Sequence, residues 1–246
     1  MRKRALVVGA SSGMGAELVR RLAHNGHRVA AVARRKDALD ALASELDPGA
    51  DGRVLTYAHD VTDTGEVSGL FEQIVRDLDG LDLVIYSAGV MPQVGEEDYD
   101  IEVDRHIVEV NVIGAMAWLN CAAERMAQLG GGTLVGIGSV AGDRGRVGNP
   151  AYGASKAALA TFMESLRNRL GPRGVTVLTV KPGPVRTPMT EGLEKLPMVI
   201  DVGVAADQIM RAIARRANVV YVPHRWRLIM GVIRAVPSSV FQRMGI

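Results

Sequence analysis

The sequence predicts a single α/β domain over residues 1–246, built on a doubly wound parallel sheet of about seven strands with helices on both faces. Short β-branched runs alternate with amphipathic segments along most of the chain, as in βαβ units. The predicted strands are almost continuously apolar, which is typical of strands covered on both faces. No repeat or linker-like run interrupts the pattern.

The elements follow in chain order. The pattern predicts strands in "RALVVG", "HRVAAVAR" and "RVLTYAHD". Between them it predicts helices in "GAELVRRLAHNG" and "ALDALASEL". In "TGEVSGLFEQIVRDLDG", apolar residues at helical spacing predict one buried stripe. Further strands are "LDLVIYSAG", "GTLVGIGS", "GVTVLTVKPG" and "NVVYVP", with long helices beginning near Val103 and Ala151. Ligands of such sheets bind beyond the carboxyl ends of the strands, so the site is predicted there.

Composition excludes several classes of function. The net charge is only +2 and both signs are mixed along the chain, so nucleic acid is not an expected partner. The single cysteine, Cys121, cannot form an internal disulfide, and the five histidines lack metal-ligand spacing, so no metal is predicted. The first apolar run is too short for a signal peptide, and no run approaches a membrane span. We therefore expect a cytoplasmic protein.

The motif "GASSGMG" predicts a phosphate cradle after the first strand. It places Gly9, Gly13 and Gly15 between a strand and a helix, where glycines allow a tight turn and let backbone N–H groups approach a pyrophosphate. Ser11, Ser12 and Met14 lie in the same turn and are candidate cofactor contacts. A glycine-rich turn that only packs is the alternative.

The end of the second strand indicates which dinucleotide binds. A ribose hydroxyl is usually held there by Asp or Glu, whereas an arginine can pair with the 2′-phosphate of NADP. Here "AVARRKD" offers Arg34 and Arg35, and Asp37 fits the start of the next helix equally well. The sequence favours NADP(H), with NAD(H) as the alternative. Arg35 fits a solvated surface position equally well.

The stretch "AYGASKAAL" places Tyr152 and Lys156 one helical turn apart. A phenol carries protons poorly at neutral pH, and a nearby ammonium lowers its pKa. Ser139, at the end of the strand "GTLVGIGS", could hydrogen-bond the same substrate oxygen. The pair alone is common on solvated helix faces.

Taken together, these motifs resemble the short-chain dehydrogenase/reductase family, whose fold is Rossmann-like. The resemblance runs from residue 4 to about 223 and rests on GxxxGxG, "HDV", "SAG", "VNV", "GSVAG", "YGASK" and "PGPVRTPM", in the family's order. The family's pattern implies a homodimer or homotetramer, formed through the two long helices.

The resemblance also implies residue roles. Tyr152 resembles the general acid or base, Lys156 the residue that lowers its pKa and holds the nicotinamide ribose, and Ser139 the group that polarises the carbonyl. Asn111 resembles the asparagine that kinks its helix and orders a water, although alone it also fits a core helix position. The remaining implied cofactor contacts are Asp60 and Val61 near the adenine, Ser87, Ala88 and Gly89 in "SAG", and Pro182, Gly183, Val185 and Thr187 near the nicotinamide.

Four positions depart from the family's pattern. Val8 stands where a threonine commonly precedes the first glycine, and "YSAG" puts Tyr86 and Ser87 where two asparagines brace the central strands. Ser12 stands where many NADP-preferring members carry a basic residue, so Arg34 must provide most of that discrimination. The catalytic set is unaffected.

The sequence thus predicts an NADP(H)-dependent reductase or dehydrogenase that acts on a small carbonyl or secondary alcohol, with a largely apolar pocket. The alternative from another class is a catalytically idle NADP(H)-binding sensor or scaffold. Arg144 and Arg146 could bind an anionic group or face water. The sequence does not name the substrate.

The C-terminal segment, at about 224–246, departs most from the family. Trp226, Ile229, Met230 and Ile233 lie at helical spacing among arginines, without acidic residues. A basic amphipathic helix of this kind fits peripheral membrane contact or a lipid-like substrate. The segment also resembles that of reductases acting on polyprenyl-phosphate-linked keto-sugars, which implies a lipid-linked keto-sugar as an alternative substrate. A pocket lid or a subunit contact is the favoured interpretation.

Overall fold

The computed structural model describes residues 3–46, 53–193 and 196–245. Its core is a seven-stranded, wholly parallel sheet in the order β3-β2-β1-β4-β5-β6-β9, which confirms the predicted fold class. The strands are β1 (Arg4–Val8), β2 (Arg28–Ala33), β3 (Val54–Ala58), β4 (Leu83–Tyr86), β5 (Gly132–Ile137), β6 (Val175–Pro182) and β9 (Val219–Val222). Two short strands, β7 (Val185–Arg186) and β8 (Ile200–Asp201), pair separately.

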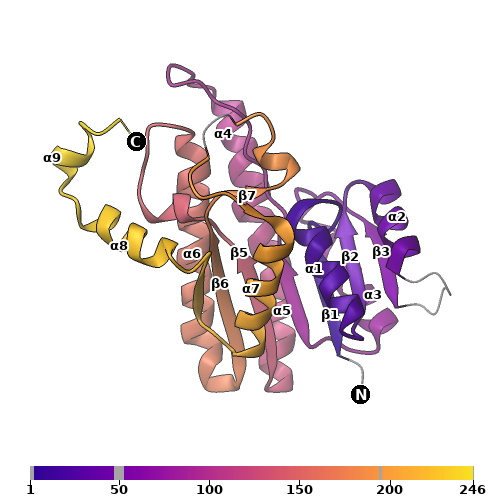
Figure 1. Ribbon diagram of the computed structural model, residues 1–246. Helices are drawn as coiled ribbons and strands as arrows, with labels where there is room; N and C mark the ends of the chain where they lie inside the picture. The colour runs from indigo at the N-terminus through magenta and orange to yellow at the C-terminus, as the bar shows by residue number, and fades with distance from the viewer. Residues whose placement is uncertain (1–2, 47–52, 194–195, 246) are drawn as a thin grey trace.

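Helices cover both faces of this sheet (Figure 1). One face packs against α1 (Gly13–His24), α2 (Lys36–Leu46) and α7 (Val202–Ala214). The other packs against α3 (Val67–Leu78), α5 (Gly114–Leu129) and α6 (Pro150–Leu170), with α4 (Ile101–Val108) beside α6. Single turns η2 (Val140–Asp143), η3 (Gly171–Arg173) and η4 (Pro188–Thr190) complete the chain before its C-terminal segment.

The strands are apolar throughout because each side chain enters one of two cores. In β1, Ala5 and Val7 belong to the core under α1 and α7, whereas Leu6 and Val8 belong to the core under α3 and α5, and all four are fully buried. This is the two-residue period of a strand with both faces covered.

The order of the strands places the site. From β1 the chain winds outward through β2 and β3, then returns to β4 on the other side of β1 and winds outward again. The connections diverge between β1 and β4, which leaves a crevice at their carboxyl ends, the usual ligand position in this architecture. The motifs at the ends of β1, β2, β3, β4 and β5 therefore lie along one edge of the sheet.

A continuous helical run joins α4, the π-helical turn η1 (Glu109–Ile113) and α5. Among the described residues, this run, Ile101–Leu129, is the one helix long and apolar enough by length and composition to cross a membrane, which the sequence analysis did not anticipate. Of its most apolar stretch, 56% is buried inside the protein. Trp118 and Leu119 are fully buried against the sheet, so the run serves as a core helix here.

The C-terminal segment forms α8 (Trp226–Ala235) and α9 (Ser238–Phe241), at one edge of the molecule beside α6 (Figure 1). The apolar face expected from the sequence is turned inward: Trp226 and Met230 form a small core with Val140, against which Ile229 and Ile233 pack. Different residues, Leu228 and Val232, are 77% and 69% exposed.

Arg144 fastens this segment to the protein. Its guanidinium donates hydrogen bonds to the carbonyl oxygens of Arg234 at 3.0 Å and Val236 at 2.9 Å, and lies 4.4 Å from the centre of the Phe241 ring. A cation is favourable at the carbonyl end of a helix. The half-buried guanidinium of Arg144 is therefore engaged with the C-terminal segment.

Candidate active site

The glycine-rich turn passes so close to its neighbours that side chains are excluded. Gly9 has φ +88°, and a Cβ there would lie 2.3 Å from the backbone nitrogen of Ala88. A Cβ on Gly15 would lie 2.0 Å from the carbonyl oxygen of Gly9. Both distances are well inside van der Waals contact, so these glycines let the turn fold back on itself and touch the loop after β4.

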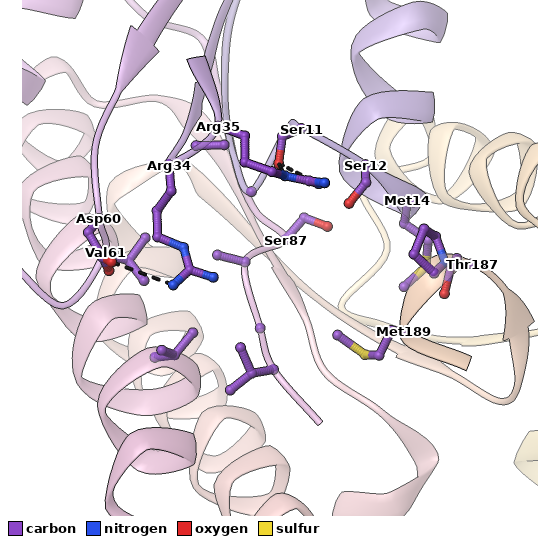
Figure 2. A pocket seen from close by; sticks show the side chains of 18 of the residues that line it. Ser11, Ser12, Met14, Arg34, Arg35, Asp60, Val61, Ser87, Thr187 and Met189 are labelled. Atoms are coloured by element: carbon purple, nitrogen blue, oxygen red, sulfur yellow. Dashed lines mark hydrogen bonds and ion pairs between the residues drawn. The ribbon is translucent and has the colours of Figure 1, made fainter. Parts of the chain in front are cut away.

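A cleft opens between this turn and the ends of β2, β3 and β4 (Figure 2). Most of the predicted cofactor residues line it, from five separate segments of the chain. They are Gly9, Ser11, Ser12, Gly13, Met14, Arg34, Arg35, Asp60, Val61, Ser87, Ala88, Gly89 and Thr187.

Six predicted cofactor residues do not line this cleft: Gly15, Tyr152, Lys156, Pro182, Gly183 and Val185. Gly183 instead lies against the indole of Trp226, whose nitrogen would be 2.0 Å from a Cβ at that position. The lining also includes residues that the sequence analysis did not assign to the cofactor, namely Ala33, His59, Val90, Val110, Pro188 and Met189. Five of the six are next to a predicted residue in sequence or closely follow Thr187. Val110 comes from the long helix, where no sequence motif indicates a cofactor contact.

Both arginines at the end of β2 face the cleft. The Arg34 guanidinium lies 3.6 Å from the Asp60 carboxylate, and Arg35 donates hydrogen bonds to the Ser11 hydroxyl at 3.0 and 3.3 Å (Figure 2). Burial opposes ionisation of Asp60, but hydrogen bonds from Thr62 and the charge of Arg34 outweigh it and lower the pKa of Asp60. The exposed side chain of Arg35 therefore lies against the glycine-rich turn.

The helix α6 presents Tyr152 and Lys156 one turn apart. It begins at Pro150, and the preceding Asn149 caps it by accepting a hydrogen bond from the Tyr152 backbone N–H at 3.0 Å. The same Asn149 side chain donates to the Pro92 carbonyl, which ties the start of the helix to the loop after β4. The Lys156 Nζ lies 5.6 Å from the centre of the Tyr152 ring.

Lys156 is only 4% exposed, and its ammonium donates a hydrogen bond to the carbonyl oxygen of Ile137 at 3.2 Å. Two glycines make room for it. A Cβ on Gly142 would lie 2.6 Å from the Lys156 carbonyl carbon, and a Cβ on Gly89 would lie 3.2 Å from its Nζ. Burial disfavours the charged form and lowers the pKa of Lys156 to about 8.

Tyr152 and Ser139 lie together beside this lysine. Burial raises the pKa of Tyr152, and the interacting hydroxyl of Ser139 offsets part of that rise. Ser139 also caps the turn η2, where its hydroxyl accepts a hydrogen bond from the Ala141 N–H at 3.0 Å. Burial therefore favours the neutral form of Tyr152.

Asn111 joins the loop after β4 to α6 from within η1. It is fully buried, its amide oxygen accepts from the Val90 N–H at 2.8 Å, and its amide nitrogen donates to the Val90 carbonyl and to the Ser155 hydroxyl, both at 3.0 Å. Ser155 in turn donates to the Tyr152 carbonyl at 2.8 Å. Since both amide hydrogens are used within the protein, only an oxygen lone pair remains for a water.

The two parts of the site meet at Gly89. This residue lines the cleft, and a Cβ there would contact both the Asn111 side chain and the Lys156 ammonium at 3.2 Å. The glycine-rich cleft and the Ser139, Tyr152, Lys156 and Asn111 group are thus neighbouring parts of one edge of the sheet.

Comparison with known proteins shows the family. A family model described as short chain dehydrogenase matches residues 3–196. An uncharacterised oxidoreductase of Myxococcus xanthus is 36% identical over 96% of this chain and 94% of its own, and carbonyl reductase family member 4 of Xenopus tropicalis is 33% identical over 79% and 80%. A solved structure of a short-chain dehydrogenase from Sphingobium yanoikuyae in complex with NADPH has a TM-score of 0.83 at 29% identity, covering 96% and 97% of the two chains. The chain belongs to the short-chain dehydrogenase family and is an oxidoreductase by that membership.

The buried Lys156 predicts a dependence of stability on pH. Its pKa is about 8 when folded and near 10.5 when unfolded, so the unfolded chain holds the proton more tightly. The penalty on folding is complete below pH 8, of the order of 3 kcal/mol, and fades as pH rises to 10.5. Lys156→Met should therefore be more stable than the wild type at pH 7, and the difference should shrink by pH 10.5 in urea unfolding series.

Lys181→Met is the matched control. Lys181 lies 2.5 Å from the Asp143 carboxylate, whose side chain is 1% exposed, so this substitution leaves a buried charge unpaired and should destabilise the protein by a few kcal/mol. A Lys156→Met protein less stable than the wild type at pH 7 would contradict the buried-charge interpretation.

Proposed function

We propose that this protein is an NADP(H)-dependent oxidoreductase that transfers hydride between nicotinamide and a carbonyl or secondary alcohol. The observation that carries the proposal is the junction at Gly89. There, a glycine-rich cleft bordered by two arginines meets the buried Lys156 and the half-buried Ser139 and Tyr152. A dinucleotide site next to a proton-transfer site suits carbonyl reduction.

The residues present fit such a cofactor. The tight turn fits a pyrophosphate, because Gly9 and Gly15 let it pack against the loop after β4 and against itself. Gly13, with φ +54°, opens α1, where backbone N–H groups stabilise a pyrophosphate. Arg34 and Arg35 border the same cleft and suit a 2′-phosphate. The relative from Sphingobium yanoikuyae holds NADPH in a chain of the same fold. When bound, the cofactor supplies or accepts the hydride.

The side chains of this protein handle the proton. Neutral Tyr152 donates its phenolic proton to the carbonyl oxygen during reduction and takes it back in the reverse direction. The Ser139 hydroxyl stabilises the charge that develops on that oxygen. The Lys156 ammonium, held by the Ile137 carbonyl, stabilises the phenolate that Tyr152 leaves behind.

The rival proposal is an idle NADP(H)-binding sensor or scaffold. Such a protein needs the glycine turn and the arginines, but has no use for a buried lysine that costs folding free energy. Lys156 lies beside Tyr152 and has no carboxylate partner among the described residues. This arrangement supports a catalytic function over cofactor binding alone.

The substrate class is proposed more coarsely. We propose a hydrophobic carbonyl or alcohol compound, with a lipid-linked keto-sugar at a membrane surface as the alternative. Carbonyl reductase family member 4 supports carbonyl chemistry through its similarity to this chain. Loss of NADPH absorbance across a panel of ketones, keto-sugars and quinones, repeated with NADH, would identify both the class and the cofactor.

The cytoplasmic location and the homodimer or homotetramer stay predictions. Exposed apolar side chains along α4, η1 and α5 support a subunit contact there. They are Ile101, Val108, Ile113 and Leu129.

Replacing the proposed acid tests the chemistry. Tyr152→Phe should lower turnover at least about a thousandfold while leaving the Kd for NADPH within about twofold, because only the proton donor is lost. Tyr99→Phe, a hydroxyl deletion at a 93% exposed position, is the control. Full activity of Tyr152→Phe would refute its role, and NADPH binding by the wild type without turnover across the panel would favour the sensor.

Replacing Arg34 tests cofactor preference. Arg34→Ala should raise the KM for NADPH about tenfold and leave that for NADH nearly unchanged, because only NADPH loses a charged hydrogen bond. Arg105→Ala is a matched control, since Arg105 is equally exposed at 58% but pairs with Glu102 on α4. A wild-type preference for NADH would overturn the proposal for Arg34.

Membrane contact by the C-terminal segment also stays a prediction. Leu228 and Val232 are exposed on α8 among arginines, and no acidic residue follows Asp207 in the sequence, which supports contact with an anionic bilayer. The protein should float with phosphatidylglycerol vesicles, and replacing both residues by serine should reduce flotation severalfold. Leu129→Ser, at an exposed position on α5, is the control, and equal flotation of all three proteins would count against the idea.

A further inference from the structure

Tyr86 makes a buried hydrogen bond that the proposed chemistry does not use. It is the last residue of β4, is fully buried, and its hydroxyl donates to the carbonyl oxygen of Val110 at 2.7 Å. Burial raises the pKa of Tyr86 further above its ordinary value, so the hydroxyl keeps its proton and acts as a fixed donor. Tyr86 does not line the cleft.

The acceptor belongs to an irregular turn of helix. Val110 lies in η1, where the N–H of Gly114 donates to the carbonyl of Glu109, five residues back, in place of the usual four. Such a turn carries one extra residue and disturbs the regular α-helical pattern of hydrogen bonds, so an outside donor helps to fix its position.

Close packing presses this turn against the strand that carries Tyr86. A Cβ on Gly114 would lie 2.8 Å from the Val61 carbonyl oxygen and 3.0 Å from the Tyr86 hydroxyl oxygen. The lack of a side chain at Gly114 therefore lets η1 approach close enough for the bond between Tyr86 and Val110.

The residue after Val110 is Asn111, whose side chain joins Val90 to Ser155. A shift of η1 would displace Asn111 and, through Ser155, the first turn of α6 that carries Tyr152. It would also change the space beside Gly89, where Asn111 and the Lys156 ammonium meet. The Tyr86 hydroxyl is thus linked to the catalytic group in two stages. It bonds to Val110, the backbone neighbour of Asn111, and the Asn111 side chain bonds to Ser155, which bonds to the Tyr152 carbonyl.

We propose that Tyr86 is a positioning residue, which holds η1 through the Val110 carbonyl and thereby sets Asn111 against α6. This inference rests on the proposed oxidoreductase function. It also gives a role to the tyrosine that stands where related sequences brace the strands with asparagine. In this chain the bracing group is the Tyr86 phenol, which bonds to the Val110 carbonyl in η1.

The test is Tyr86→Phe, which removes the hydroxyl alone, with Tyr57→Phe as the matched control. Tyr57 also makes a hydroxyl hydrogen bond of 2.7 Å, to Asp77 on α3, away from the catalytic group. Tyr86→Phe should lower kcat about tenfold, leave the KM for NADPH within about twofold and shift the pH profile of kcat, because Tyr152 and Lys156 lose their fixed surroundings. Tyr57→Phe should change none of these, even if it destabilises the fold as much.

A second measurement does not depend on turnover. Hydrogen exchange of the Asn111 side-chain amide, followed by NMR, should be at least about tenfold faster in Tyr86→Phe than in the wild type or in Tyr57→Phe. Unchanged kcat and pH profile, or unchanged exchange, would overturn the role of Tyr86. Absence of turnover in the wild type would instead refute the oxidoreductase function, while the exchange rates would still decide whether Tyr86 holds Asn111.

Discussion

The site depends on a lysine ammonium buried without a carboxylate partner among the described residues. Removing Lys156 from water disfavours its charge, and its ammonium donates a hydrogen bond to the carbonyl of Ile137 at the end of β5. The surrounding chain is shaped to this position: Gly142 lets η2 touch α6 beside Lys156, and Gly89 leaves space at the Nζ. A group kept at such a cost in folding free energy points to function, since stability alone would favour an apolar side chain.

Burial favours the neutral form of both Tyr152 and Lys156. It lowers the pKa of Lys156 to about 8 and raises the pKa of Tyr152, so each is driven toward its neutral form. A neutral phenol is the form that can donate a proton. The charged form of a lysine whose pKa is near 8 is stabilised by a nearby negative charge, such as that of the phenolate. The hydroxyl of Ser139 acts on the pKa of Tyr152 in the opposite direction to burial and lowers it.

The sequence predicted the fold and most of the cleft because those signals are local. Strand and helix periods, the glycines at Gly9 and Gly15, and the arginines after β2 each depend on residues within one βαβ unit. Long-range contacts carried no such signal. The sequence could not show that Val110 would reach the cleft from the long helix, that Arg144 would cap α8 some 90 residues later, or that Tyr86 would bond to η1. The sequence predicted the apolar face of the C-terminal helix. It could not show that this face would pack against Val140 in a small separate core.

The central claim is that Lys156 is a buried, weakened base at the junction of the two parts of the site. An NMR titration of the protein labelled with ¹³C at the lysine Cε, with the signal assigned through Lys156→Met, tests it most directly. The account predicts that the Lys156 signal titrates near pH 8, well below the bulk of the lysine signals. A Lys156 pKa near 10.5 would show that the ammonium is solvated, and would contradict its burial at the junction of the two parts of the site.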